Sequence, residues 1–230
     1  MKTHYELVGQ GCPIIYLHGW GAEGSIFRQV AHRLPQYSNY LLDFAGFGQS
    51  DLPDSKGWDV SDYAAQLIEF MSEKGITSAT LVGHSFGCRV AMFVAATRPD
   101  LVERMLLFAP AGLRRFSLKR FLKVKLFKLR KRFCPQKTKD GGSEDYRNCS
   151  DEMKRTFVKV VNQDLSEYAK RIKCHTLIVN GRQDTATPLK HAKRLNRLIE
   201  NSELVEIDGD HFAFFYAPQA FADTIEIFVG

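Results

Sequence analysis

The sequence lacks the features of a membrane-spanning or disulfide-built protein. No run approaches the roughly 18 consecutive apolar residues of a membrane span, and the first residues contain no apolar stretch of signal-peptide length. The five cysteines are odd in number and show no Cys-x-x-Cys spacing, which argues against a disulfide framework or a zinc site. Free thiols fit a reducing compartment, so we expect a cytoplasmic protein without a bound metal.

Acidic residues are missing from one long segment. The 230 residues carry 32 Lys and Arg and 26 Asp and Glu, a net charge of +6. Residues 113–139 contain 12 of the basic residues and no acidic residue, so the rest of the chain carries 20 basic and 26 acidic residues, a net charge of −6. The basic character therefore belongs to one segment. A composition of 44% hydrophobic and 25% charged residues excludes an intrinsically disordered chain.

Short apolar runs predict buried parallel strands, because a strand covered on both faces is apolar without alternation. The runs are 13–17, 39–43, 79–82, 105–108, 176–180 and 204–207, with an edge strand at 3–8. Helical patterns lie between them at 59–74, 86–97, 188–198 and 218–228, the first with Ser61 or Asp62 as its N-terminal cap. This alternation predicts an α/β protein with a mostly parallel sheet and helices on both faces.

The alternation breaks once, between about residues 112 and 171, where strand signals are absent and most of the pattern is helical. We therefore expect a core in two parts, 1–111 and 169–230. Between them we expect a helical insertion at 112–168 that is strongly basic at 113–139.

Gly-His-Ser-Phe-Gly at 83–87 stands directly between an apolar strand and an apolar helix. A tight strand-to-helix turn holds such a serine in a strained backbone conformation that exposes its Oγ. Gly83 and Gly87 have no Cβ atom, so the strand and the helix can approach closely. The N-terminal end of the helix favours developing negative charge. We expect Ser85 to be a nucleophile.

A serine hydroxyl needs a base to take its proton, and that base needs a group that orients it. His211 follows the last predicted strand in a small acidic loop, and Asp184 ends the loop after the 176–180 strand. Asp208 and Asp210 are alternative acids. We prefer Asp184, because it follows its own strand and can approach the imidazole Nδ1 from the side.

Two backbone amides are candidates for an oxyanion hole. One is the N–H of Phe86, directly after the serine. The other is the N–H of Trp20 in His-Gly-Trp-Gly at 18–21, which ends an early strand with two glycines. The substrate-binding candidates are His18, Gly19, His84 and Phe212.

These motifs resemble the α/β-hydrolase superfamily, in its single-domain serine esterase branch. Ser85, Asp184 and His211 follow one another in the order of that superfamily, and 43–50 resembles its Asp-x-x-Gly-x-Gly-x-Ser loop. Serine at position 85 argues against the haloalkane dehalogenase branch, which has Asp there. Within the superfamily the chain is similar to carboxylesterases, to hydrolases of carbon–carbon bonds in ring-cleavage products, and to pimeloyl-acyl-carrier-protein methyl ester esterase.

The resemblance implies an α/β-hydrolase fold in which the insertion forms a helical lid over the active site. It implies a cofactor-free serine hydrolase that cleaves a carboxylic ester or thioester through an acyl-enzyme intermediate. Two alternatives stay open. The same three residues cleave carbon–carbon bonds in some relatives, and a hydrolase scaffold can also serve as a non-catalytic ligand receptor.

The basic segment has several interpretations. It can be a lid helix whose Lys and Arg are simply solvated. It can also dock an acidic acyl-carrier protein, attract an anionic substrate or lie on an anionic membrane surface. Nucleic acid is not an expected partner, because the aromatic residues of the basic segment lie at helical spacing and no RNA-binding signature accompanies them.

Overall fold

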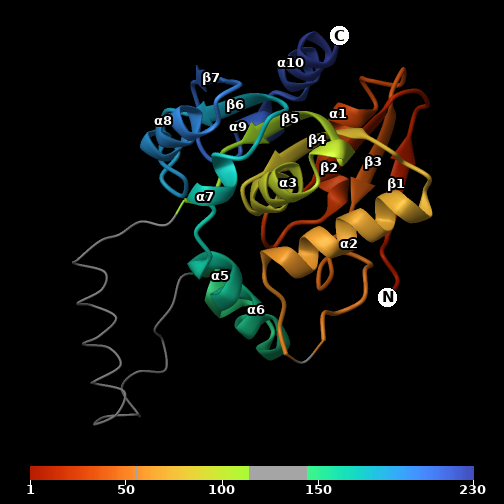
Figure 1. Cartoon of the computed structure of the whole chain (residues 1–230), viewed down its shortest axis with the longest axis vertical. Helices are drawn as coiled ribbons and strands as arrows, with labels where there is room; N and C mark the ends of the chain where they lie inside the picture. The colour runs from red at the N-terminus through yellow and green to blue at the C-terminus, as the bar shows by residue number, and fades with distance from the viewer. Residues whose placement is uncertain (55, 114–143) are drawn as a thin grey trace.

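The computed structural model describes residues 1–54, 56–113 and 144–230 (Figure 1). In this part of the chain seven strands form one sheet in the order β1-β3-β2-β4-β5-β6-β7. All neighbours are parallel except β1 (Tyr5–Val8), which pairs antiparallel with β3 (Ser38–Leu42) at the edge. The other strands are β2 (Pro13–Leu17), β4 (Ala79–His84), β5 (Val102–Phe108), β6 (His175–Gly181) and β7 (Ser202–Ile207). The prediction of a mostly parallel sheet is confirmed.

Helices cover both faces of the sheet, as predicted. One face carries α2 (Val60–Glu73), α3 (Phe86–Thr97), α7 (Ser166–Ala169) and α8 (Leu189–Leu198). The other carries α1 (Arg28–Ala31), α9 (Ala213–Tyr216) and α10 (Pro218–Val229). Successive strand residues supply the two cores, because side chains alternate across a sheet. In β2, Ile15 packs into the core on the side of α2 and α3, and Ile14 packs into the core on the side of α1 and α10.

Helix α2 begins differently from the prediction. Its N-terminal cap is Asp59, whose carboxylate accepts hydrogen bonds from the N–H groups of Ser61 (2.7 Å) and Asp62 (3.4 Å). Asp62 reciprocates, since its carboxylate accepts a bond from the N–H of Asp59. The expectation that Ser61 or Asp62 caps the helix is therefore wrong. The reciprocal pair between Asp59 and Asp62 satisfies the first free N–H groups of the helix, and buried Val60 already lies inside it.

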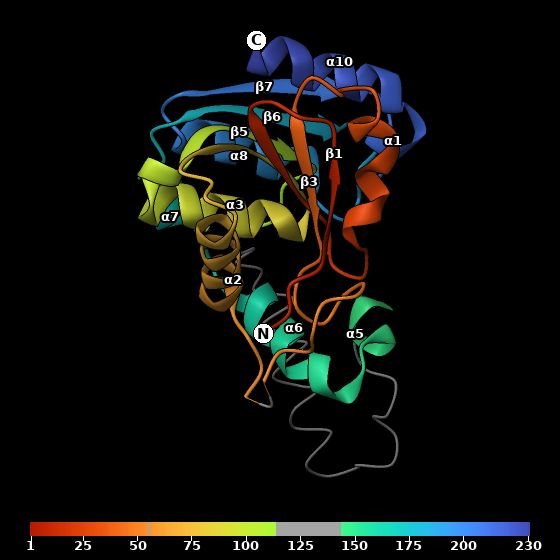
Figure 2. The same cartoon turned by 90° about the vertical axis from the view of Figure 1, so that its right-hand side faces the viewer.

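The described part of the predicted insertion contains α5 (Glu144–Asn148) and α6 (Asp151–Asn162), followed by α7. Figure 2 shows α5 and α6 beyond one end of the sheet, apart from the layers of helices on its faces. Of the basic segment predicted at 113–139, all but Leu113 lies outside the described residues. No helix in the described ranges is long and apolar enough to cross a membrane.

Candidate active site

A sharp turn between β4 and α3 carries Ser85. The strand ends at His84 and the helix begins at Phe86, so Ser85 alone makes the turn, at φ 50° and ψ −104°. Its N–H donates to the carbonyl of Phe108 (3.0 Å), and its own carbonyl accepts a bond from the N–H of Ala111 (3.3 Å). A non-glycine residue at positive φ is strained, and these two bonds hold it there.

The glycines that flank Ser85 make the turn possible. A Cβ on Gly83 would lie 2.9 Å from the backbone N of Cys88, and one on Gly87 would lie 1.9 Å from the carbonyl O of Leu17. The first contact is between β4 and α3, as the sequence suggests. The second is between α3 and β2, a neighbouring strand that the motif itself does not contain. The helix can therefore approach the sheet only where these two side chains are missing.

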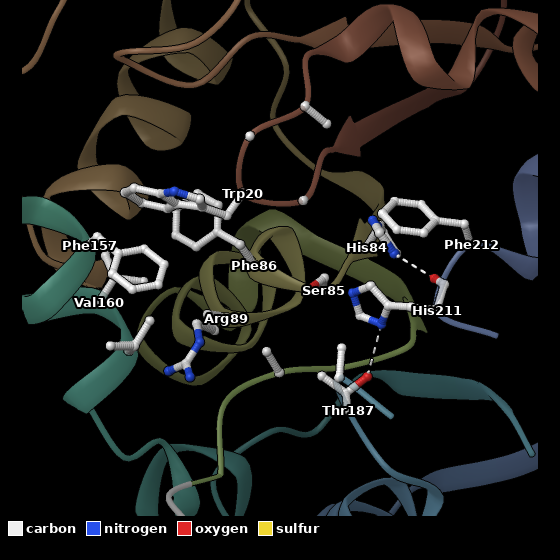
Figure 3. A pocket seen from close by; sticks show the side chains of 16 residues that line it. Trp20, His84, Ser85, Phe86, Arg89, Phe157, Val160, Thr187, His211 and Phe212 are labelled. Atoms are coloured by element: carbon white, nitrogen blue, oxygen red, sulfur yellow. Dashed lines mark hydrogen bonds between the residues drawn. The ribbon is translucent and has the colours of Figure 1, made fainter. Parts of the chain in front are cut away.

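Ser85 lies on the wall of a cavity of about 470 Å³ (Figure 3). The polar side chains of His84, Thr187 and His211 lie on one side of the serine. Aromatic and aliphatic side chains line the other side. This volume suits a small organic molecule. The apolar lining comprises Trp20, Phe86, Phe157, Val160 and Val161, of which the last three belong to α6.

The structure brings Asp184 and His211 together. The two residues are 27 apart in sequence, yet Nδ1 of His211 lies 2.8 Å from Oδ2 of Asp184. The Asp184 side chain is fully buried, and the His211 side chain is 16% exposed. Because a carboxylate only accepts, Nδ1 must carry the proton, which leaves Nε2 free to accept one. Figure 3 shows the imidazole of His211 beside Ser85.

The two alternative acids point elsewhere. Asp208 is exposed and forms an ion pair with Arg182 (2.9 Å). Asp210 accepts a hydrogen bond from the N–H of Phe212 (2.9 Å). The geometry thus favours Asp184 as the partner of His211.

Thr187 is a member of the site that sequence reasoning missed. Its N–H donates to Oδ1 of Asp184 (2.8 Å), and its hydroxyl lies 2.7 Å from Oδ2 of Asp184 and 2.9 Å from the carbonyl of Ala109. Burial by itself raises the pKa of Asp184, but the hydrogen bonds from His211 and Thr187 outweigh it and hold that pKa below its usual range. The Asp-x-x-Thr spacing is the available signal, because an aspartate often accepts from the backbone a few residues onward.

The two candidate oxyanion donors both belong to residues of the cavity wall, Trp20 and Phe86. Phe86 is the first residue of α3, and the first N–H groups of a helix have no partner within it. Trp20 is held through its ring, which packs edge-on against Phe47, Phe86 and Phe157. Gly19, His84 and Phe212 also line the cavity.

His18 is not among the residues that line the cavity. It is fully buried, its Nδ1 lies 2.8 Å from the carbonyl of Gly19, and its Nε2 accepts a bond from the N–H of Phe44 (3.0 Å). Burial lowers its pKa to about 4, so the ring is neutral. The expectation that His18 contacts substrate therefore finds no support in its position. The ring braces the turn that presents Trp20.

His84 links the serine turn to the histidine loop. Its Nε2 donates to the carbonyl of His211 (3.0 Å), and burial lowers its pKa to about 3. Its Nδ1 is buried and has no hydrogen-bond partner among the described residues. Those residues also contain no cluster of His, Cys, Asp or Glu that could hold a metal ion.

Comparison with protein families adds a decisive observation. The model of the alpha/beta hydrolase family matches residues 14–224, which is most of the chain. The chain belongs to the alpha/beta hydrolase family. It is therefore an enzyme of the hydrolase type, and the resemblance seen in the sequence is confirmed.

The relatives of this alpha/beta hydrolase include esterases. It is 28% identical to the AB hydrolase superfamily protein YisY of Bacillus subtilis (strain 168), over 92% of this chain and 88% of that one. It is 23% identical to a pimeloyl-[acyl-carrier protein] methyl ester esterase of Aeromonas salmonicida (strain A449), over the whole of both chains. The solved enol-lactonase from Burkholderia xenovorans LB400 superposes with a TM-score of 0.79 at 19% identity, over 99% of this chain and 96% of that one. At that identity the likeness shows the fold.

Proposed function

We propose that this protein hydrolyses a carboxylic ester or thioester through an acyl-enzyme intermediate, with Ser85 as nucleophile, His211 as base and Asp184 as the acid that orients it. One observation carries the proposal. The strained serine at the start of α3 shares a cavity with an imidazole whose Nδ1 lies 2.8 Å from a buried carboxylate. The esterases among the relatives agree with this chemistry.

The reaction uses these groups in sequence. Oγ of Ser85 attacks the carbonyl carbon of the substrate while Nε2 of His211 takes the hydroxyl proton. The N–H groups of Trp20 and Phe86 stabilise the negative charge on the carbonyl oxygen. The bond to the leaving group breaks as His211 returns the proton to the departing alcohol or thiol. Water then repeats the attack on the acyl-enzyme, releases the carboxylic acid and restores Ser85.

A Ser85→Ala variant tests the proposal. We expect turnover of p-nitrophenyl esters to fall by about three orders of magnitude or more, as is typical when the nucleophile of such a triad is removed. A fluorophosphonate probe should add one covalent label to the wild type, at Ser85, and none to the variant. Ser72→Ala is the matched control, since Ser72 is an exposed serine on α2. Wild-type turnover in the Ser85→Ala variant would overturn the proposal.

The same assay distinguishes the two alternatives. Cleavage of vinylogous diketones with little turnover of simple esters would assign the site to carbon–carbon bonds. A receptor would bind a ligand with a thermal shift, yet stop after about one turnover. Multiple turnover of an ester excludes both outcomes.

We further propose that the insertion at 112–168 forms a lid over this site and that its basic segment docks an acidic acyl-carrier protein in the cytoplasm. The support is the 12 basic residues at 113–139, without one acidic residue, and the relative that acts on a carrier-protein ester. An acidic partner is steered toward such a charge.

Charge reversal tests the docking. We expect Lys123→Glu, Lys125→Glu and Lys128→Glu together to lower the ratio of kcat/KM on a carrier-bound ester to that on the free ester. The control carries the same charge change at the exposed residues Lys173, Lys190 and Arg197. An unchanged ratio would contradict the docking, and reduced binding to anionic vesicles instead would assign the segment to a membrane surface.

A further inference from the structure

Arg89 is a buried cation in the wall of the candidate active site. It is 8% exposed and lines the cavity together with Ser85 (Figure 3). Among the described lining residues it is the only lysine or arginine, and Phe157 and Val160 of α6 lie across the cavity from the polar side. A charged group is rarely buried unless another group balances its charge.

The position of Arg89 follows from the helix that begins directly after the serine. Arg89 lies in the first turn of α3, which begins at Phe86, and it lines the same cavity as Ser85. The short stretch of chain around the start of α3 therefore supplies both the candidate nucleophile and a cation to one cavity wall. A substrate that fits this cavity of about 470 Å³ and reaches both groups has a short spacer between them.

The guanidinium retains hydrogen-bonding capacity. Among the described residues, the guanidinium makes one hydrogen bond, from Nη1 to the carbonyl of Gln163 (3.0 Å), although it has five N–H donors. No described carboxylate forms an ion pair with Arg89, although the negative charge of Asp164 lies near enough to raise the pKa of Arg89 somewhat. Burial lowers its pKa to about 10, so the group stays charged at neutral pH. The planar fork of an arginine fits a carboxylate through two parallel hydrogen bonds.

Building on the hydrolase function proposed above, we propose that Arg89 binds a carboxylate of the substrate. The preferred substrates are then esters that carry a second, free carboxylate, with a short apolar spacer that lies against Phe157 and Val160. The charge can stand on the acyl part, as in a monoester of a dicarboxylic acid, or on the leaving group, as in an acylated hydroxy acid. The experiment separates these two sources.

Two matched pairs of substrates report the preference. The first pair is the monomethyl and the dimethyl ester of the same dicarboxylic acid, and the second is an O-acetyl hydroxy acid and its methyl ester. For the wild type we expect a higher kcat/KM on the charged member of one pair, and that pair shows which side of the scissile bond carries the charge. Equal kcat/KM within both pairs would overturn the proposal.

Arg89→Met removes the charge while keeping a long apolar side chain. We expect the ratio of kcat/KM, charged member to neutral member, to fall about tenfold to a hundredfold, mainly through KM, as for the loss of a hydrogen bond to a charged group. If Arg89 had a purely structural role and only connected α3 to Gln163, its loss would lower kcat/KM equally for the charged and the neutral member. An equal loss therefore contradicts the proposal. Arg33→Met, on an exposed arginine next to α1, is the control.

A binding measurement keeps this proposal separate from the proposed reaction. Glutarate or adipate should raise the melting temperature of the wild type and of Ser85→Ala, and should have no effect on Arg89→Met. This result would stand even if no ester were turned over. Should Arg89→Met fail to fold, Arg89→Lys keeps the charge without the fork and should keep a reduced shift. Absence of any shift with the wild type would overturn the proposal.

Discussion

The backbone of Gly87 lies so close to the carbonyl of Leu17 that a Cβ on Gly87 would lie 1.9 Å from that oxygen. The contact joins α3 to β2 and thereby sets the place where Ser85 meets the turn that carries Trp20. Both partners are regular backbone, so neither can move aside without displacing its helix or its strand.

Gly87→Ala should therefore lower both stability and activity. We expect the free energy of unfolding to fall by about 1–3 kcal/mol or more, as for an overpacked core, and kcat to fall because the Phe86 N–H shifts with the helix. Gly75→Ala is the control, since Gly75 has φ 66° but open space around it. It carries backbone strain without the clash and should leave kcat intact. Urea denaturation and ester kinetics measure both effects, and a Gly87→Ala variant with wild-type kcat would contradict this account.

Asp184→Asn tests which acid orients the histidine. An amide cannot enforce the Nδ1–H tautomer of His211, so kcat should fall by about 10⁴-fold, the loss known from other triads. Asp208→Asn and Asp210→Asn should each stay close to wild type, because these carboxylates bind Arg182 and the Phe212 N–H instead. If either surface variant lost as much activity as Asp184→Asn, the assignment would be wrong.

Thr187→Val removes the hydroxyl next to the Asp184 carboxylate while keeping the shape of the side chain. The backbone bond from residue 187 to Oδ1 remains, so we expect a partial loss, about 10- to 100-fold in kcat, the usual effect of one hydrogen bond to a charged group. The pKa of Asp184 should rise toward its ordinary value. Thr187→Ser, which restores the hydroxyl, should recover most of the activity. Equal activities of the Val and Ser variants would show that the hydroxyl is dispensable.

Buried His18 should make the fold sensitive to acid. Its pKa is about 4 in the folded protein, against an ordinary value of 6.5, so below pH 6.5 the unfolded chain binds a proton that the folded chain does not. Stability is then lost as the pH falls from 6.5 toward 4, by at most about 1.4 kcal/mol per pH unit for this group. Buried His84, with a pKa of about 3, acts in the same direction.

His18→Gln checks this prediction. The variant is expected to be less stable at pH 7, because it loses the brace between Gly19 and Phe44, but to show a flatter pH dependence of stability between pH 7 and 5. His32→Gln changes an exposed histidine, so its stability should depend on pH in the same way as that of the wild type. Urea denaturation at each pH gives the comparison, and parallel curves for His18→Gln and the wild type would refute the prediction.

The fold class and the order of the candidate site residues can be predicted from the amino-acid sequence alone. Apolar strands and amphipathic helices alternate because a parallel sheet must be covered on both faces, and this pattern is local. The glycines around Ser85 are likewise a local signal, since only a tight turn requires them. The cap of α2 shows the limit of such signals. Three residues suit a cap by their type, namely Asp59, Ser61 and Asp62. The helix begins at buried Val60, so Asp59 is the residue that caps it.

The side chains that surround the serine, in contrast, depend on long-range packing. His18 stands two residues before Trp20, a candidate oxyanion residue, yet it does not line the cavity and instead accepts a hydrogen bond from the N–H of Phe44, 26 residues onward. Thr187 follows β6 and Arg89 lies on α3, and both line the cavity. Phe157 of α6 lines it as well. Periodicity and motifs describe each segment alone. Which side chains share a cavity depends on how strands far apart in sequence align, and packing sets that alignment.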